Sequence, residues 1–176
     1  NDEKIAFLKI DRIQKEWKLK VLDKNKGNPF SIITENDRDG WVDNDGQIYF
    51  LDDGRVIWIS EKTGYKHIRI AKHSGSREWP ITNGEWEVKE IKHIDENNEL
   101  VYFTANKEST FENRFYSIRF DGTDIKLLTS ESGDHQIKIS GTRKYFIDTY
   151  SSMKKPKTII LKEIKSGETI TIIDTT

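Results

Sequence analysis

Cysteine is absent from this chain of 176 residues, which excludes a disulfide framework and a thiolate metal site. No hydrophobic run is long enough to read as a bilayer-spanning helix. An excess of either charge is also missing, because 29 Lys and Arg stand against 30 Asp and Glu, for a net charge of -1. Without a basic field to attract phosphates, the composition disfavours nucleic acid as a partner.

Aromatic residues are plentiful, with five Trp, six Tyr and eight Phe, although hydrophobic residues make up only 34% of the chain. A disordered chain would not carry so many aromatics, and the combination favours many short strands over large amphipathic helices. The chain begins at Asn1 rather than Met, with no signal-peptide pattern before the first strand-like segment. We interpret this start as a boundary or a processed end.

One pattern recurs four times: an alternating strand, a turn with glycine, and a short apolar strand that usually closes with Thr. Two markers within it advance together, in steps of 48, 47 and 45 residues. The turn glycines are Gly27, Gly75, Gly122 and Gly167, and the closing apolar residues are Ile33, Ile81, Leu128 and Ile173. Because the two markers are independent, the chain contains an internal repeat.

Each repeat also contains a strand that is apolar at successive positions, which predicts burial on both faces. These strands are IAFLKI from Ile5, VIWIS from Val56, LVYFTA from Leu100 and KYFIDTY from Lys144. The outer strands alternate instead, as Trp17, Leu19 and Val21 do with the lysines between them. The last three repeats gain a leading strand, in GQIYF, EWEVKEI and HQIKIS.

The strand count predicts an all-β fold: a partial β-propeller of three four-stranded antiparallel blades plus a three-stranded partial blade. The partial blade spans residues 5–34, the full blades span 41–82, 86–129 and 135–174, and together they form a single domain over 1–176. A β-sandwich would have no reason to repeat at every fourth strand. Closed propellers have roughly four to eight blades, so we expect this chain alone to be an open arc that associates, as a homodimer or with another chain.

Six stretches from Ser60 onward resemble, in order and spacing, the propeller of dipeptidyl peptidase IV-like serine peptidases of the prolyl oligopeptidase family. They are SEKTGYKHI (60–68), GEWEVKEI (84–91), LVYFTANKES (100–109), RFYSIRFDG (114–122), LLTSESGDHQIKIS (127–140) and KYFIDTYSS (144–152). The first forty residues match more loosely, through KIAFLKIDR and the WVD at 41–43. The resemblance identifies the chain as the C-terminal half of such a propeller.

The resemblance implies a propeller of about eight blades that caps an α/β-hydrolase domain. Such enzymes are exopeptidases that remove dipeptides, with Pro or Ala second, from peptide N-termini. The implied partners are the hydrolase domain of the same polypeptide, the remaining blades and peptide substrates. The resemblance implies that the protein is secreted or periplasmic, and association with the cell envelope is compatible with either location.

No catalytic, cofactor-binding or metal-binding residue is predicted in this chain. The Gly-x-Ser-x-Gly turn of the hydrolase is absent, and the paired glutamates with which the family captures the substrate's ammonium group have no match. We therefore expect the chain itself to be non-catalytic and to control substrate access and orientation. The alternative is a non-catalytic propeller module that binds a protein or peptide partner, because fold alone does not decide function.

Two groups of residues could suggest a functional site, but each has a simpler structural explanation. None of His67, His73, His93 and His135 has metal-ligand spacing, and His67 is expected at the surface or as a cap. The acidic stretch DRDGWVDNDG at 37–46 lacks the glycine that an EF-hand loop needs at its sixth position. It is interpreted as a blade-connecting loop, which by the resemblance faces the substrate chamber.

The tryptophans are expected to serve packing more than ligand binding. Trp58 and Trp86 are predicted in strands and in the core, while Trp41 and Trp79 border loops. The Lys-rich segment 4–26 is interleaved with acidic residues and is interpreted as a solvated face.

Overall fold

The structure, a computed structural model, describes residues 4–25, 27–37, 39–42, 46–72 and 77–175. In these ranges every regular element is a strand, and the strands form four separate antiparallel sheets. This confirms the all-β prediction of one three-stranded and three four-stranded sheets. Consecutive strands pair in every sheet, as expected for blades built from hairpins.

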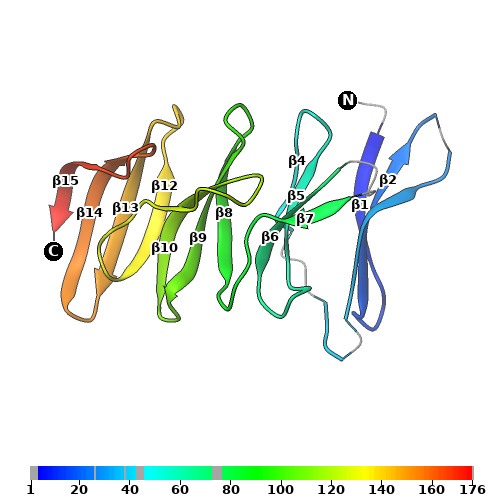
Figure 1. The fold of residues 1–176 in the computed structure, drawn as a ribbon, viewed down its shortest axis with the longest axis horizontal. Coiled ribbons are helices and arrows are strands. Elements are labelled where there is room, and N and C mark those ends of the chain that lie inside the picture. The colour runs from blue at the N-terminus through cyan, green and yellow to red at the C-terminus, as the bar shows by residue number, and fades with distance from the viewer. Residues whose placement is uncertain (1–3, 26, 38, 43–45, 73–76, 176) are drawn as a thin grey trace. The chain divides into compact units, whose positions relative to one another are not determined.

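The bounds of the strands follow the repeats (Figure 1). The first sheet contains β1 (Lys4–Ile10), β2 (Glu16–Asp23) and β3 (Phe30–Asn36). The second contains β4 (Ile48–Phe50), β5 (Val56–Ser60), β6 (His67–Ala71) and β7 (Glu78–Pro80). The third contains β8 (Val88–Asp95), β9 (Leu100–Ser109), β10 (Glu112–Arg119) and β11 (Lys126–Leu127). The fourth contains β12 (Asp134–Ile139), β13 (Tyr145–Ser152), β14 (Lys155–Glu163) and β15 (Thr169–Thr175).

The chain divides into two compact units, residues 1–82 and residues 83–176. The first unit contains the first two sheets and the second unit contains the other two. A single domain over the whole chain stays a prediction.

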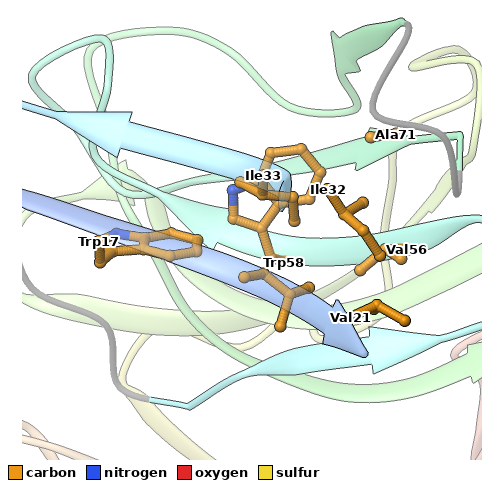
Figure 2. Close-up of a cluster of buried hydrophobic side chains, with 8 residues drawn as sticks. Trp17, Val21, Ile32, Ile33, Val56, Trp58 and Ala71 are labelled. Carbon is orange, nitrogen blue, oxygen red and sulfur yellow. The ribbon is translucent and has the colours of Figure 1, made fainter. Parts of the chain in front are cut away.

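In the first unit the core lies between the two sheets. Trp17, Leu19 and Val21 of β2 are buried, while the lysines between them are half-buried. This is the period-2 alternation that the sequence predicts for a strand with one face in the core. Figure 2 shows this cluster, whose buried members are Trp17, Leu19, Val21, Ile32, Ile33, Val56, Trp58 and Ala71.

In the second unit the core is aromatic. The rings of Phe115 and Phe146, from neighbouring sheets, meet edge to face with centroids 5.0 Å apart, a favoured arrangement of two quadrupoles. Tyr102 tilts against Phe115 at 6.2 Å. The buried members of the cluster are Tyr102, Phe115, Leu128, Ile137, Phe146 and Ile164.

The prediction of strands buried on both faces is confirmed for β5 and for residues 101–105 of β9, and is wrong for two others. All seven residues of β1 are exposed, and β13 alternates, with Phe146 buried and Tyr145 and Ile147 exposed. Both strands belong to sheets at the ends of the described chain. In its own unit each of these sheets packs against one neighbour, which leaves one face of β13 uncovered. β1 is in addition the edge strand of its sheet and is exposed on both faces.

The turn and the closing Thr of the repeat each have a structural reason. Gly122 turns the chain with a φ of 83°, a left-handed conformation that favours glycine; Gly75 lies outside the described residues. Oγ1 of Thr82 accepts a hydrogen bond from the backbone N–H of Ile68 at 2.9 Å, and Oγ1 of Thr129 accepts one from that of Phe115 at 3.1 Å. The hydroxyl thus replaces a backbone acceptor where the outer strand ends.

Candidate functional site

A cavity of about 380 Å³ opens in the first unit beside the connection from β3 to β4. Its lining combines that connection with the turn between β5 and β6: Glu35, Asn36, Asp37, Asp39, Trp41, Val42, Glu61, Lys62 and Gly64. The described part of the acidic stretch 37–46 therefore lines a pocket, as a connecting loop between two sheets. Residues 43–45 lie outside the described residues.

Glu35 anchors this pocket to the second sheet. It is 6% exposed, and its Oε1 accepts a hydrogen bond of 2.8 Å from Nε1 of Trp58. Burial raises the pKa of the Glu35 carboxyl, although hydrogen bonds from Ser60 and Trp58 oppose the shift. Glu35 was not predicted from the sequence. Its signal is the strand alternation, because Glu35 follows Ile33 by two positions and so shares its buried face.

Asp37 shapes the loop that follows. Its carboxylate accepts the backbone N–H groups of Gly40 and Asp39, each at 2.9 Å, which is the geometry of an Asx turn. These hydrogen bonds lower the pKa of Asp37, so the group is ionised. Nζ of Lys15 donates to the carbonyl oxygen of Gly40 and ties the loop to the β1–β2 turn.

Trp41 stands at the edge of the pocket with 77% of its surface exposed, so the expectation that it packs is wrong. The connection has left both sheets at this point and carries the indole away from the core. Lys62, the one lysine of the lining, pairs with Glu78 at 2.7 Å. The described lining contains carboxylates, an indole and the amine of Lys62 but no hydroxyl, thiol or imidazole, so it offers polar and aromatic contacts to a ligand.

The other tryptophans divide between core and rim. Trp58 is fully buried, as predicted. Trp86 is outside the strands, just before β8, and is half-buried with its ring stacked on Phe103 at 6.3 Å. Its prediction as a core strand residue is wrong. Trp79 lies in β7 and is half-buried.

The described histidines lie in separate places. His67 is 3% exposed, with Nδ1 3.1 Å from Oγ1 of Thr82, because β6 is covered on both faces; its expected surface position is wrong. His93 stacks on Tyr102 at 5.9 Å, and burial followed by the charge of Arg143 lowers its pKa. His73 lies outside the described residues. In the part of the chain that the structure describes, no group of three or more metal-ligating side chains is found.

His135 and Asp148 form a buried pair in the second unit. Nδ1 of His135 lies 2.8 Å from Asp148 Oδ1, and Nε2 lies 2.9 Å from the backbone oxygen of Glu131. A catalytic triad would need a serine hydroxyl at that second nitrogen. A carbonyl occupies the position instead, so the pair holds the connection between the third and fourth sheets and does not activate a nucleophile.

Glu131 is held a second time by a lysine. Nζ of Lys162, 1% exposed, donates to its Oε2 at 2.9 Å. Burial raises the pKa of Glu131, but the hydrogen bond from Lys162 and its charge outweigh this, and the pKa is lowered overall. Neither this pair nor the His135–Asp148 pair was predicted from the sequence, because the partners in each pair are far apart along the chain.

Among the described residues, no helix has the length and apolar character needed to cross a membrane.

Comparison with known proteins points to one family. The profile described as the dipeptidyl peptidase IV (DPP IV) N-terminal region matches residues 1–157. A probable dipeptidyl peptidase 4 of Emericella nidulans is 26% identical over 86% of this chain, and dipeptidyl peptidase 4 of Trichophyton equinum is 28% identical over 88%. This chain spans 21% of the length of each of these relatives.

Solved structures agree on the fold. A crystal structure of Porphyromonas gingivalis dipeptidyl peptidase 4 superposes with a TM-score of 0.87 at 24% identity, over 99% of this chain and 25% of that one. A putative dipeptidyl aminopeptidase IV from Bacteroides ovatus superposes with a TM-score of 0.84 at 20% identity, over 98% of this chain and 27% of that one. The resemblance found in the sequence is confirmed, and this chain belongs to the family of the dipeptidyl peptidase IV N-terminal region, as part of its propeller.

Proposed function

We propose that this chain is part of the propeller of a dipeptidyl peptidase IV-like serine exopeptidase, which removes dipeptides with Pro or Ala second from peptide N-termini. The observation that carries the proposal is the family match over residues 1–157. The geometry of the chain's own polar groups agrees with a non-catalytic role, since Nε2 of the buried His135 contacts a carbonyl and not a nucleophile.

In this proposal the propeller controls access and orientation while an α/β-hydrolase domain of the same polypeptide performs the chemistry. The blades wall off a chamber that admits unfolded peptide ends and excludes folded proteins. The remaining blades and the peptide substrates are the other partners. A secreted or periplasmic location, with contact to the cell envelope, suits an enzyme that acts on free peptides.

An activity assay of the purified chain tests whether the chain itself is non-catalytic. Incubated with a chromogenic Xaa-Pro substrate, the chain should release no dipeptide, while Porphyromonas gingivalis dipeptidyl peptidase 4 serves as the positive control. Turnover that co-elutes with the folded chain would overturn the non-catalytic role.

Sequencing the reading frame on both sides of the chain tests the enzyme itself. We expect further blades upstream, and downstream a Gly-x-Ser-x-Gly followed by Asp and His. A start just before Asn1 and a stop just after Thr176 would instead support a propeller module that binds a protein or peptide.

A further inference from the structure

One large aromatic side chain is left unpacked beside the cavity of the first unit. Trp41, in the connection from β3 to β4, lines this cavity of about 380 Å³ and keeps 77% of its surface exposed. An indole that its own unit covers this little is available to a ligand that enters the cavity. Ligand pockets of proteins hold roughly 300–1,000 Å³, so this cavity suits a single side chain better than a large ligand.

The connection that carries Trp41 is strongly acidic. Residues 35–46 contain five Asp and Glu against one Arg. Asp37 and Asp39 are both exposed and line the cavity, and the side chain of Asp39 has no ion pair or hydrogen bond to another residue that the structure describes. The surroundings of Trp41 therefore favour a positively charged ligand over a neutral or negative one.

The lysines near the cavity do not cancel this charge. Lys62 pairs with Glu78 at 2.7 Å, and Lys66 pairs with Glu61 at 3.5 Å. Lys15, whose Nζ donates to a backbone carbonyl, acts on Asp37 more weakly than the hydrogen bonds of the loop do. Even when Lys15 is set against Asp37, the charge of Asp39 remains.

A metal ion fits the cavity less well than an organic cation. In the described ranges of the chain, no three His, Cys, Asp or Glu side chains come together in a group that could hold a metal. An exposed indole beside carboxylates instead offers an aromatic face and hydrogen-bond acceptors to the same ligand.

We propose that this cavity binds the guanidinium group of an arginine side chain in a peptide. A guanidinium is planar and weakly hydrated, so it stacks on an indole while its N–H groups donate to carboxylates. The ammonium group of lysine is compact and strongly hydrated and has no flat face to stack. That the arginine belongs to a peptide rests on the proposed function, in which this connection faces the substrate chamber.

An NMR titration of the isotope-labelled 176-residue chain tests the proposal. The probe is an N-acetylated, C-amidated peptide with one arginine, so that neither terminus carries a charge. Among the indole N–H signals of the five tryptophans, the one that W41A removes should shift on titration. The same peptide with citrulline, which keeps the shape without the charge, should bind at least about tenfold more weakly, and the peptide with lysine roughly fivefold more weakly.

Variants at the cavity separate the ring from the charge. W41A should weaken binding roughly fivefold through loss of the stacking face, and D39N roughly threefold through loss of one solvated carboxylate. The backbone signal of Gly64, which also lines the cavity, reports the Kd of both variants.

F111A and D124N are the matched controls in the second unit. Phe111 is 91% exposed, and the side chain of Asp124 is 80% exposed. Both controls should leave the Kd unchanged. All four variants should keep the thermal transition of the parent chain, because the altered side chains are exposed.

Four results would overturn the proposal. They are an unshifted Trp41 indole signal, equal affinity for the arginine and citrulline peptides, equal affinity for the arginine and lysine peptides, and equal losses in the cavity variants and the controls. None of these results bears on the peptidase function, because binding is measured without catalysis. A reading frame without a hydrolase domain would conversely remove the peptidase function and leave the measured affinity intact.

Discussion

At the scale of the residue, Glu35 links the pocket to the core. It is an acidic side chain in a buried position, and its hydrogen bond satisfies the indole N–H of Trp58, which is itself fully buried. A buried donor left without an acceptor costs more than an ordinary hydrogen bond contributes. Glu35 thus affects stability through two opposed effects, desolvation of its charge and satisfaction of Trp58.

Substituting Glu35 should separate these effects. E35A leaves Nε1 of Trp58 unsatisfied and should lower the free energy of unfolding by about 1–3 kcal/mol. Burial raises the pKa of Glu35, so the folded state binds the proton of this carboxyl more tightly than the unfolded state. The contribution of Glu35 to stability therefore falls as the pH rises above the ordinary pKa of Glu. E35Q still accepts from Trp58 and should gain stability relative to the parent as pH rises above about 4, the ordinary pKa of Glu.

Thermal unfolding at several pH values measures the stability of E35A and E35Q relative to the parent, with E61Q as the control. Glu61 lines the same pocket but is exposed, and its surface ion pair with Lys66 at 3.5 Å contributes little. A constant difference between E35Q and the parent across the pH range would contradict the buried-carboxyl interpretation.

At the scale of the element, two polar pairs, one buried and one half-buried, hold the connection between the third and fourth sheets. His135 of β12 binds the Glu131 backbone and Asp148 of β13, while Lys162 of β14 binds the Glu131 side chain. Three consecutive strands therefore position one connection. Removing one partner of such a pair destabilises the fold, because the charge of the other partner is then no longer compensated.

The variant K162A should lower the free energy of unfolding by about 1–3 kcal/mol, because the half-buried Glu131 loses a charged hydrogen-bond partner. K155A, in an exposed position of the same strand, should change it by less than about 0.5 kcal/mol. The pKa of Glu131 is lowered overall, so its contribution is present above the ordinary Glu value and is lost as pH falls through the lowered pKa. Denaturant titration at neutral and acidic pH measures the effect of each substitution and its dependence on pH. Equal effects of K162A and K155A would contradict a stabilising role for the Lys162–Glu131 pair.

At the scale of the whole molecule, apolar residues remain uncovered on the first and last strands. All residues of β1 and of β15 are exposed, and Ile170 and Ile172 of β15 are 51% and 64% exposed. Both strands are also edge strands, with backbone groups available for pairing. A relative that is about four times as long has further chain to cover such surfaces.

Studied alone, the chain should therefore associate. Sedimentation velocity should show an apparent mass that rises with concentration, and I170K/I172K should lower this association because the charges oppose burial. I125K, which adds a charge away from β15, is the control. A single monomeric species at all concentrations would contradict the prediction.

The alternation of residues within a strand was readable from the sequence because it depends on local geometry. Trp17, Leu19 and Val21 were assigned to one buried face, and the turn at Gly122 was located correctly. Burial on the second face was not readable for β1, since it depends on a neighbouring sheet. The pocket at Glu35 was missed for the same reason, because Trp58 lies 23 residues away.

The sequence alone determined the repeat, the all-β class, the pairing of strands within each sheet and the family, because each depends on local periodicity or on motifs in order. Only the tertiary structure decided which apolar residues are covered, that His67 is buried and Trp41 exposed, and that the polar groups of Glu131, His135, Asp148 and Lys162 meet. Side-chain contacts between sheets depend on how distant segments pack, and no spacing along the chain encodes that packing.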